Sequence, residues 1–214
     1  KIAITGLSHK VIHNLLYRVE EMASKKQIEF AGYKRGNLED DDQIFNGEFI
    51  KTHSKDPIFM DALKETNSGQ IFAGTKFHLA SRYYDEQIDY LFIDEAGQVS
   101  LADLISIGNI AKNIVLIGDQ NQLGQPIKGT HPNKSGQSIL DYLLEGKDTI
   151  PEDRGIFLNK TYRLHPKIND FISSNFYEDR LICDDRTDRR NISFNKNSLI
   201  KDSGIHFIEM NYNL

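Results

Sequence analysis

Two short apolar segments that each end in acidic residues constrain the fold of this chain most strongly. Residues 91–93 (Leu-Phe-Ile) lead into Asp94, and residues 114–117 (Ile-Val-Leu-Ile) lead into Gly118-Asp119. An uninterrupted apolar run of this kind is typical of a strand covered on both faces, as in a parallel sheet. Open α/β sheets bind ligands at the carboxyl ends of their strands. The two segments therefore predict a polar crevice that suits a metal ion and phosphate chemistry.

Composition narrows the class of protein. With 39% apolar and 27% charged residues among 214, the chain is typical of a globular protein, with room for one domain and part of another. No apolar run approaches the roughly 20 residues that span a bilayer, and the first residues resemble a buried strand rather than a signal peptide. We therefore expect a cytoplasmic protein without a membrane partner. The single cysteine, Cys183, cannot form an internal disulfide, which agrees with a reducing compartment.

Strands alternate with helices through the first part of the chain, which predicts a doubly wound parallel sheet with helices on both faces. Ser8 is expected to cap a helix that has Val11 and Val19 on its apolar face. Residues 34–56 are polar, and we expect them to form a surface excursion. The expected strands lie at 1–5, 28–33, 70–73, 91–93 and 114–117.

The rest of the chain is predicted to open a second domain. Residues 151–155 have the composition of a linker, so we place the first domain at 1–150 and the start of the second at 151–214. In the second domain we expect strands at 156–158 and 205–210 around a helix at 166–175.

The acidic pair Asp94-Glu95 is the first candidate catalytic element. A carboxylate at a strand end can hold Mg²⁺, and a neighbouring glutamate can orient and deprotonate an attacking water. The alternative is an acidic loop that caps the following helix. The presence of a second acid-tipped strand favours the catalytic interpretation.

The second candidate element is the segment from Gly118 to Leu123. Gly118 would let the backbone approach a ligand closely, Asp119 adds a carboxylate, and the amide of Gln122 can donate to a terminal phosphate oxygen and accept from water. The alternative is an ordinary Gly-Asp turn, which taken alone would be the more common structure.

Arg163 is the third candidate. Arginine is always charged and recognises phosphate with two parallel hydrogen bonds, and an arginine supplied by a second domain can stabilise the charge that develops during phosphoryl transfer. The alternative is an arginine at a helix start that forms an ion pair.

These elements together resemble a known family. Three motifs occur in order, at 94–98 (Asp-Glu-Ala-Gly-Gln), 118–123 (Gly-Asp-Gln-Asn-Gln-Leu) and 162–166 (Tyr-Arg-Leu-His-Pro). This set resembles the helicase core of superfamily 1, specifically its Upf1-like and Dna2-like branch, and most of all the bacterial proteins that join a RecB-like nuclease to such a helicase. The resemblance implies a RecA-like P-loop NTPase sheet followed by the start of a second RecA-like domain.

The resemblance also implies roles for the motif residues. ATP and Mg²⁺ would be the cofactors, with Asp94 binding the metal and Glu95 activating the hydrolytic water. Gln122 would sense the γ-phosphate, with Gly118 and Asp119 beside the nucleotide. Arg163 would reach across from the second domain.

Single-stranded DNA is the partner that the resemblance implies, although RNA is possible. Thr5, Ser8, His9 and Thr75 would lie along the strand, in the regions similar to motifs Ia and Ib. His9 stands where the family usually has asparagine. Because the net charge is −5, any such contact must be local.

A P-loop is missing from the sequence. The one near match, residues 69–76, reverses the final threonine and lysine and replaces the loop with an apolar strand, which would consume the amides a phosphate nest needs. The family's P-loop precedes motif Ia, so we expect it before Lys1 in a longer parent chain, where a RecB-like nuclease domain is also possible.

We therefore expect a fragment of an ATP-dependent DNA helicase or translocase, with 5′ to 3′ movement usual in this branch. The isolated fragment should not hydrolyse ATP by itself. Two alternatives stay open: a non-enzymatic module that binds nucleic acid or protein, and a nucleotide hydrolase that does not translocate.

Overall fold

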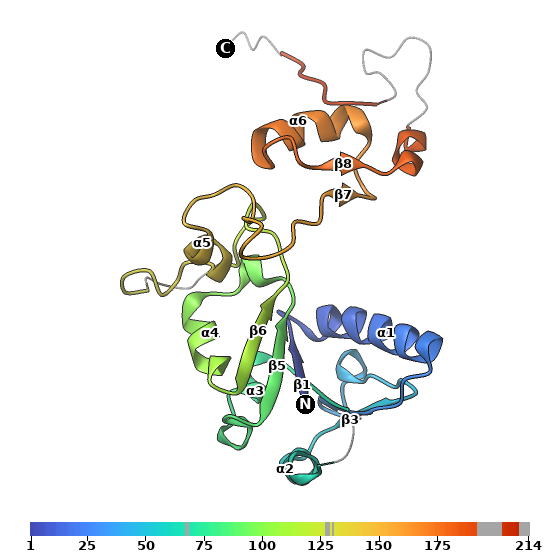
Figure 1. The fold of residues 1–214 in the computed structure, drawn as a ribbon, viewed down its shortest axis with the longest axis vertical. Helices are drawn as coiled ribbons and strands as arrows, with labels where there is room; N and C mark the ends of the chain where they lie inside the picture. Colours follow the sequence, from blue (N-terminus) through green and yellow to red (C-terminus); the bar gives the residue numbers. More distant parts are fainter. Residues whose placement is uncertain (67–68, 127–128, 130, 192–202, 210–214) are drawn as a thin grey trace, which may run out of the picture. The chain divides into compact units, whose positions relative to one another are not determined.

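The computed structural model describes residues 1–66, 69–126, 129, 131–191 and 203–209. The chain forms two compact units, Lys1–Glu145 and Gly146–Leu214, which Figure 1 colours from blue to yellow and from yellow to red. This division lies a few residues before the boundary predicted at residue 150. The assignment of each unit to a RecA-like domain stays a prediction.

A six-stranded sheet forms the centre of the first unit. Its strands lie in the order β3-β2-β4-β1-β5-β6, and every neighbouring pair is parallel. This confirms the predicted α/β fold with a parallel sheet. The strands are β1 (Ile2–Thr5), β2 (Ala31–Arg35), β3 (Ile50–His53), β4 (Gln70–Ala73), β5 (Ile88–Ile93) and β6 (Ala111–Leu116).

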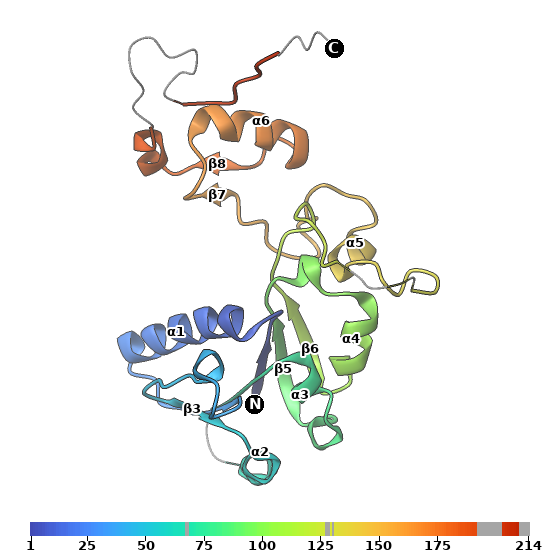
Figure 2. The same ribbon diagram turned by 180° about the vertical axis from the view of Figure 1, so that it is seen from behind.

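Helices cover both faces of this sheet, as predicted. Figures 1 and 2 show α1 on one side and α3 and α4 on the other. The helices of the first unit are α1 (His9–Lys26), α2 (Asp56–Lys64), α3 (Lys76–Leu79), α4 (Leu101–Gly108) and α5 (Ile139–Leu144). In the part of the chain that the structure describes, no helix has the length and apolar character needed to cross a membrane.

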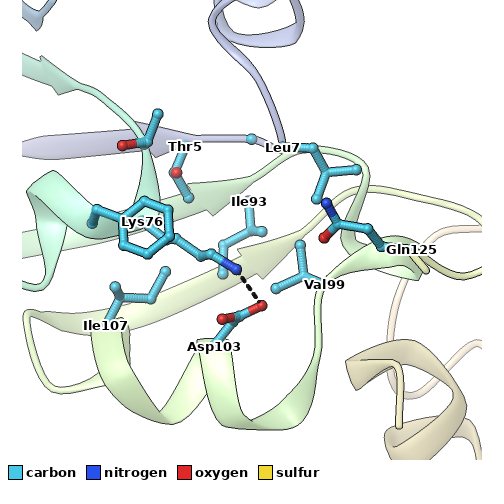
Figure 3. A pocket seen from close by; sticks show the side chains of 11 residues that line it. Thr5, Leu7, Lys76, Ile93, Val99, Asp103, Ile107 and Gln125 are labelled. Atoms are coloured by element: carbon cyan, nitrogen blue, oxygen red, sulfur yellow. Dashed lines mark ion pairs between the residues drawn. The ribbon is translucent and has the colours of Figure 1, made fainter. Parts of the chain in front are cut away.

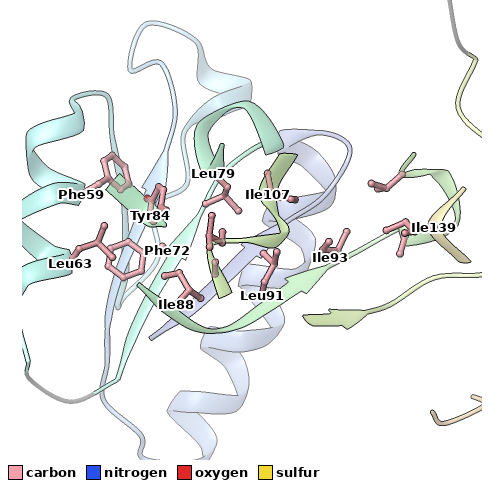
Figure 4. Close-up of a cluster of buried hydrophobic side chains, with 14 of the residues drawn as sticks. Phe59, Leu63, Phe72, Leu79, Tyr84, Ile88, Leu91, Ile93, Ile107 and Ile139 are labelled. Carbon is pink, nitrogen blue, oxygen red and sulfur yellow. The ribbon is translucent and has the colours of Figure 1, made fainter. Parts of the chain in front are cut away.

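The alternation of side chains along the strands divides the core into two clusters. Ala3 in β1 and Phe72 in β4 pack with side chains from α2, α3 and α4, and Figure 4 shows this larger cluster. Ile4, which follows Ala3, packs on the opposite face with Ile12 and Leu16 of α1. Both α1 side chains are fully buried, and such burial stabilises a fold by about 2 kcal/mol each.

Helix α1 begins where the sequence predicts. The Oγ of Ser8 accepts a hydrogen bond from the backbone N–H of Val11 at 3.3 Å, which satisfies one of the free donors of the first turn. The helix ends at Gln27, which adopts the left-handed conformation, and Lys25 and Lys26 lie in the last turn where their charge complements the helix dipole.

Residues 34–56 are not the simple surface excursion that we expected, because they contain β3. The strand was missed because it is short and lies at the edge of the sheet, and because it buries only alternate residues, Ile50 and Thr52, within a polar stretch. The carboxylate of Glu20 on α1 anchors its approach by accepting hydrogen bonds from the three backbone N–H groups of residues 48–50.

Among the described residues, short 3₁₀ turns lie between or beside the larger elements. They are η1 (Asp41–Gln43), η2 (Arg82–Tyr84), η3 (Ala96–Gln98) and η4 (Asp185–Arg189).

The second unit has a smaller regular framework. Strands β7 (Lys160–Thr161) and β8 (Ile182–Cys183) pair in parallel, and α6 (Pro166–Phe176) connects them. The helix begins at the predicted proline. The strand predicted at 156–158 is wrong, since Ile156 and Leu158 are exposed in irregular structure. Residues 205–209 also form no strand, and Met210 lies outside the described residues.

Candidate functional site

The loops that follow four strands meet at one edge of the sheet. Strands β4, β1, β5 and β6 are consecutive neighbours, so the residues after them lie at a common carboxyl edge. Ile93 of β5 is paired with Leu116 of β6, which places the two acid-tipped strands side by side. The sequence-based expectation that these strands are adjacent is therefore confirmed.

The β5 and β6 loops contact each other through backbone atoms at two glycines. A Cβ atom on Gly97 would lie 2.1 Å from the carbonyl oxygen of Asp119, and one on Gly118 would lie 2.7 Å from the nitrogen of Ala96. The Ala96 N–H donates to the carbonyl oxygen of Ile117 at 2.8 Å. We expected Gly118 to allow close approach of a ligand, and the structure shows a second requirement, the approach of the neighbouring loop.

The backbone turns sharply between Asp94 and Glu95. Glu95 has φ 57° and ψ 39°, the left-handed region that costs a residue with a side chain about 1 kcal/mol or more. Asp94 Oδ1 accepts a hydrogen bond from the Glu95 N–H at 3.0 Å, which holds the turn. Non-glycine residues in this conformation concentrate at functional sites.

The alternative role of the acidic pair, capping the next helix, is wrong. No side-chain hydrogen bond from Glu95 caps η3, and α4 is capped by Ser100, whose Oγ accepts from the Asp103 N–H at 3.1 Å. The carboxylates of Asp94 and Glu95 are both half-buried. Their position is therefore not explained by local helix capping.

The residues at this edge fit a magnesium ion better than a metal held by protein alone. Among the described residues, no three His, Cys, Asp or Glu side chains gather into a metal-binding group. Mg²⁺ is usually held by one or two carboxylates together with waters and substrate phosphates. Asp94 keeps Oδ2 outside the hydrogen bonds of the described residues, and this oxygen suits such a ligand.

The segment after β6 forms a local turn. Asp119 Oδ1 accepts a hydrogen bond from the Asn121 N–H at 3.0 Å, and the Gln122 N–H lies 3.4 Å from the Asp119 carbonyl oxygen. The Gly-Asp turn that we considered as the alternative is thus present in the backbone. Gln122 itself is exposed, so its amide is accessible to a ligand.

Arg163 lies in the second unit, in the loop between β7 and α6. Thr161 Oγ1 shapes this loop by accepting hydrogen bonds from the N–H groups of Arg163 and Leu164 at 3.2 and 3.3 Å. The alternative of a helix-start ion pair is not what the structure shows, because the exposed guanidinium of Arg163 has no carboxylate partner among the described residues.

Two of the residues expected to contact nucleic acid, Thr5 and Thr75, line one small pocket of about 180 Å³. Figure 3 shows this pocket with the ion pair between Lys76 and Asp103, whose atoms are 2.6 Å apart, crossing it. Thr5 is 3% exposed, and its Oγ1 has no hydrogen-bond partner among the residues that the structure describes. A residue buried this deeply can touch only a group that enters the pocket.

A larger groove of about 550 Å³ brings His9 and Thr75 together at the carboxyl edge of β2, β3 and β4. We call it the β2 groove. Ser8 lies beside it in sequence, is exposed, and uses its hydroxyl to cap α1. The groove is lined by His9, Arg35, Gly36, Asn37, Gln43, Ser54, Asp56, Thr75, Phe77, His78 and Ser81.

Sequence reasoning missed Arg35 and Phe77 in this groove. Arg35 Nη1 pairs with Asp56 Oδ1 at 2.5 Å, and Phe77 is 81% exposed. The predicted strand at 28–33 ended too early, so Arg35 was not placed at the carboxyl edge of β2. Phe77 follows the predicted Thr75 closely, and an exposed aromatic beside a predicted contact was the signal that could have found it.

A network of aromatic side chains, made by His78, Tyr83 and Tyr84, supports the β2 groove. His78 Nε2 and the hydroxyl of Tyr84 are 2.8 Å apart, and the Tyr83 hydroxyl donates to Asp56 at 3.2 Å. Burial, and then the charge of Arg35, lowers the pKa of His78 to about 4. The ring of His78 is therefore neutral at physiological pH.

Residues 69–76 do not form a phosphate-binding loop. They contain β4, whose residues pair with β1 on one side and β2 on the other, so their backbone amides lie within the sheet. This agrees with the rejection of the segment as a P-loop.

The chain is similar to a known domain family and to several helicases. Residues 136–213 match the family model described as an AAA domain. The chain is 33% identical over 108 residues to a DNA replication ATP-dependent helicase/nuclease of Schizosaccharomyces pombe, a match of 50% of this chain and 8% of that protein. It is 26% identical over 187 residues to the corresponding Xenopus laevis protein, covering 85% of this chain and 17% of that one.

A third relative is also a helicase. The helicase SEN1 of Saccharomyces cerevisiae is 35% identical over 98 residues, which is 44% of this chain and 4% of that protein. The chain therefore spans less than a fifth of the length of these relatives. The AAA-domain match and these relatives show that the chain is similar to helicases, and its parallel α/β sheet agrees with that similarity.

Proposed function

We propose that this chain is a segment of an ATP-dependent helicase or translocase that acts on single-stranded DNA. The observation that carries the proposal is the backbone contact between the β5 and β6 loops. Gly97 and Gly118 allow two loops with acidic side chains to lie together at the carboxyl edge of adjacent parallel strands. ATP-dependent helicases among the relatives make ATP the natural ligand of such an edge.

The proposed hydrolytic roles follow from the chemistry of each side chain. Asp94 would hold Mg²⁺, which when bound neutralises charge on phosphate oxygens. Glu95 would orient the attacking water and accept its proton, and the exposed amide of Gln122 would donate to the terminal phosphate. Gly118 and Asp119 would border the nucleotide.

Arg163 completes the proposed catalytic set. Its exposed guanidinium has no carboxylate partner among the described residues, and it would stabilise the charge that develops on the transferred phosphoryl group. The phosphate-cradling loop would come from another segment of the parent protein, since β4 cannot supply it. A RecB-like nuclease domain in the same parent protein is part of the proposal.

The β2 groove is the proposed path of the nucleic acid strand. His9 and Thr75 would contact the sugar-phosphate backbone there. Thr5, the last residue of β1, and Ser8, in the loop after it, would lie along the same nucleic acid. Phe77 would offer a face on which a base can stack, as is common in proteins that bind single strands. ATP-driven closure of two domains steps such contacts along a strand in motors of this kind. We propose movement in the 5′ to 3′ direction because that direction is usual in the branch of helicases that the motifs resemble.

The test is the substitution Glu95→Gln in the full-length protein that contains this chain. We expect DNA-stimulated phosphate release to fall at least about 100-fold, because the amide cannot accept the proton of the water. Glu86→Gln is the matched control, since Glu86 also has a positive φ, at 56°, but precedes β5 at the opposite end of the strand.

The outcomes separate the proposal from its two rivals. An unchanged rate for Glu95→Gln would show that Glu95 does not activate the water. A full-length protein that binds DNA and hydrolyses no ATP would be a non-enzymatic binding module. Hydrolysis that does not respond to DNA would indicate a nucleotide hydrolase that does not translocate.

A further inference from the structure

A lysine lies fully buried beneath the β2 groove. Lys34 of β2 has 0% exposure, although its side chain carries an ammonium group. No carboxylate lies within ion-pair distance of Lys34 Nζ among the described residues. Burying a charge without a counter-ion costs free energy unless each of its hydrogens is bonded. The hydrogen-bond partners of Lys34 therefore indicate its role.

All three hydrogens of the ammonium have an acceptor. Lys34 Nζ lies 2.9 Å from His9 Nδ1 and donates to the carbonyl oxygens of Arg35, at 3.0 Å, and of Gln43. Burial lowers the pKa of Lys34 to about 8, with partial compensation by the charge of Asp40. The group therefore stays an ammonium near pH 7, and an ammonium can only donate.

This arrangement determines the state of the His9 ring. Because Nδ1 accepts a hydrogen bond from Lys34, it cannot carry a proton, and the neutral ring must hold its proton on Nε2. Burial, and then the charge of Lys34, lowers the pKa of His9 below its ordinary 6.5, which favours the neutral ring. His9 thus lines the groove as a donor at Nε2.

We infer that Lys34 is a positioning residue that fixes His9 as an Nε2–H donor to a phosphate oxygen of single-stranded nucleic acid in the β2 groove. The inference rests on the proposed function and names the chemistry of one of its contacts. Among the residues that line the groove, the charges of Arg35 and Asp56 pair with each other. The ammonium of Lys34, next to His9, is only partly compensated by Asp40, and this remaining positive charge favours an anion. Lys34 would act through His9 and through its charge, without touching the strand.

The first test reads the tautomer of His9 directly. In the 214-residue chain, the ¹⁵N chemical shifts of the His9 ring should show a protonated Nε2 and a bare Nδ1. In Lys34→Met this preference should weaken, since the methionine sulfur donates no hydrogen bond. A proton on Nδ1 in the unaltered chain would overturn the inference even if Lys34→Met did not fold.

The second test measures binding of a short fluorescent oligothymidylate by anisotropy. His9→Ala and Lys34→Met should each weaken binding roughly tenfold, because the first removes the donor to a charged group and the second removes the hydrogen bond that orients this donor. His9→Gln should restore most of the affinity, since its amide can donate from the place of Nε2. The control Lys51→Met removes a charge from the exposed side of β3 and should change the affinity less than about twofold.

Combining the substitutions separates positioning from simple charge. If Lys34 acts through His9, Lys34→Met should have much less effect in the His9→Gln background. An equal effect in both backgrounds would overturn the positioning role. Unchanged binding by His9→Ala would overturn the inference alone and leave strand binding intact, whereas absence of oligothymidylate binding by the unaltered chain would overturn the proposed nucleic-acid function as well.

Discussion

The two parts of the carboxyl edge are built in different ways. At β5 and β6 the loops are held by backbone contacts, with Gly97 and Gly118 at the points of closest approach. At β2, β3 and β4 the groove is held by side chains, through the contacts of Lys34 with His9 and of Arg35 with Asp56. The first arrangement depends on the absence of a side chain, and the second on charged and aromatic groups that come from distant parts of the sequence.

The largest expected effect comes from placing a side chain between the two loops. Gly97→Ala should lower the free energy of unfolding by at least about 3 kcal/mol, because its Cβ would lie 2.1 Å from a backbone oxygen that cannot move independently. Denaturant unfolding measures the loss. Gly124→Ala is the control, because beyond its two chain neighbours no atom of the described residues lies within 4 Å of the added Cβ, and its stability should stay within about 0.5 kcal/mol. Equal stability of the two variants would contradict the docked loops.

The second-largest expected effect is a loss of stability in acid, which acts on the side-chain network around His78. His78 has a pKa of about 4 in the folded protein and about 6.5 when unfolded, so the unfolded chain binds more protons between these values. Unfolding free energy should therefore fall as the pH drops from 6.5 to 4, by on the order of 3 kcal/mol. Urea titrations across this range should show a shallower fall for His78→Leu.

Two adjacent tyrosines give a finer comparison within the network. Tyr84 is fully buried with its hydroxyl 2.8 Å from His78 Nε2, so Tyr84→Phe should cost about 2 kcal/mol by leaving a buried nitrogen without a partner. Tyr83 is only partly buried, and Tyr83→Phe should cost less than about 1 kcal/mol. Thermal unfolding of both variants decides this, and a larger cost for Tyr83→Phe would place the centre of the network elsewhere.

The smallest effect concerns the exposed aromatic of the groove. Phe77→Ala should leave stability unchanged and weaken binding of an oligothymidylate about fivefold, at the low end of what stacking on one base contributes. Leu123→Ala offers the comparison, because Leu123 is 92% exposed in the loop after β6. Equal weakening by both substitutions would contradict our assignment of nucleic acid binding to the β2 groove and of nucleotide binding to the β5 and β6 loops.

The part of the edge held by backbone contacts is also the part that sequence reasoning found. Apolar strands ending in Asp94 and Gly118 are local signals, and the parallel sheet brings their ends together whatever surrounds them. The helix after Ser8 was equally predictable, because its cap and its apolar spacing are both local. These features need no knowledge of distant contacts.

Of the part held by side chains, the sequence predicted His9 and Thr75 but missed β3, Arg35 and the contact of Lys34 with His9, for physical reasons. β3 is a short edge strand with two buried positions, so its period is lost in a polar stretch. The strand predicted at 28–33 stopped two residues before β2 does, so Arg35 was not expected at the carboxyl edge. The pairing of Lys34 with His9 joins residues 25 apart in sequence, and no local pattern encodes it. In the second unit, the apolar residues around Ile156 have the composition of a strand, but Ile156 is exposed and the segment pairs with no strand among the described residues.

We propose that ATP is hydrolysed at the β5 and β6 loops and that the nucleic acid strand binds in the β2 groove. The most direct measurement compares ATP hydrolysis and oligothymidylate binding in the full-length protein for Glu95→Gln and Arg35→Ala. We predict that Glu95→Gln loses hydrolysis and keeps strand binding, while Arg35→Ala weakens strand binding and keeps basal hydrolysis. Loss of both activities in each variant at unchanged stability, or full hydrolysis by Glu95→Gln, would contradict this account.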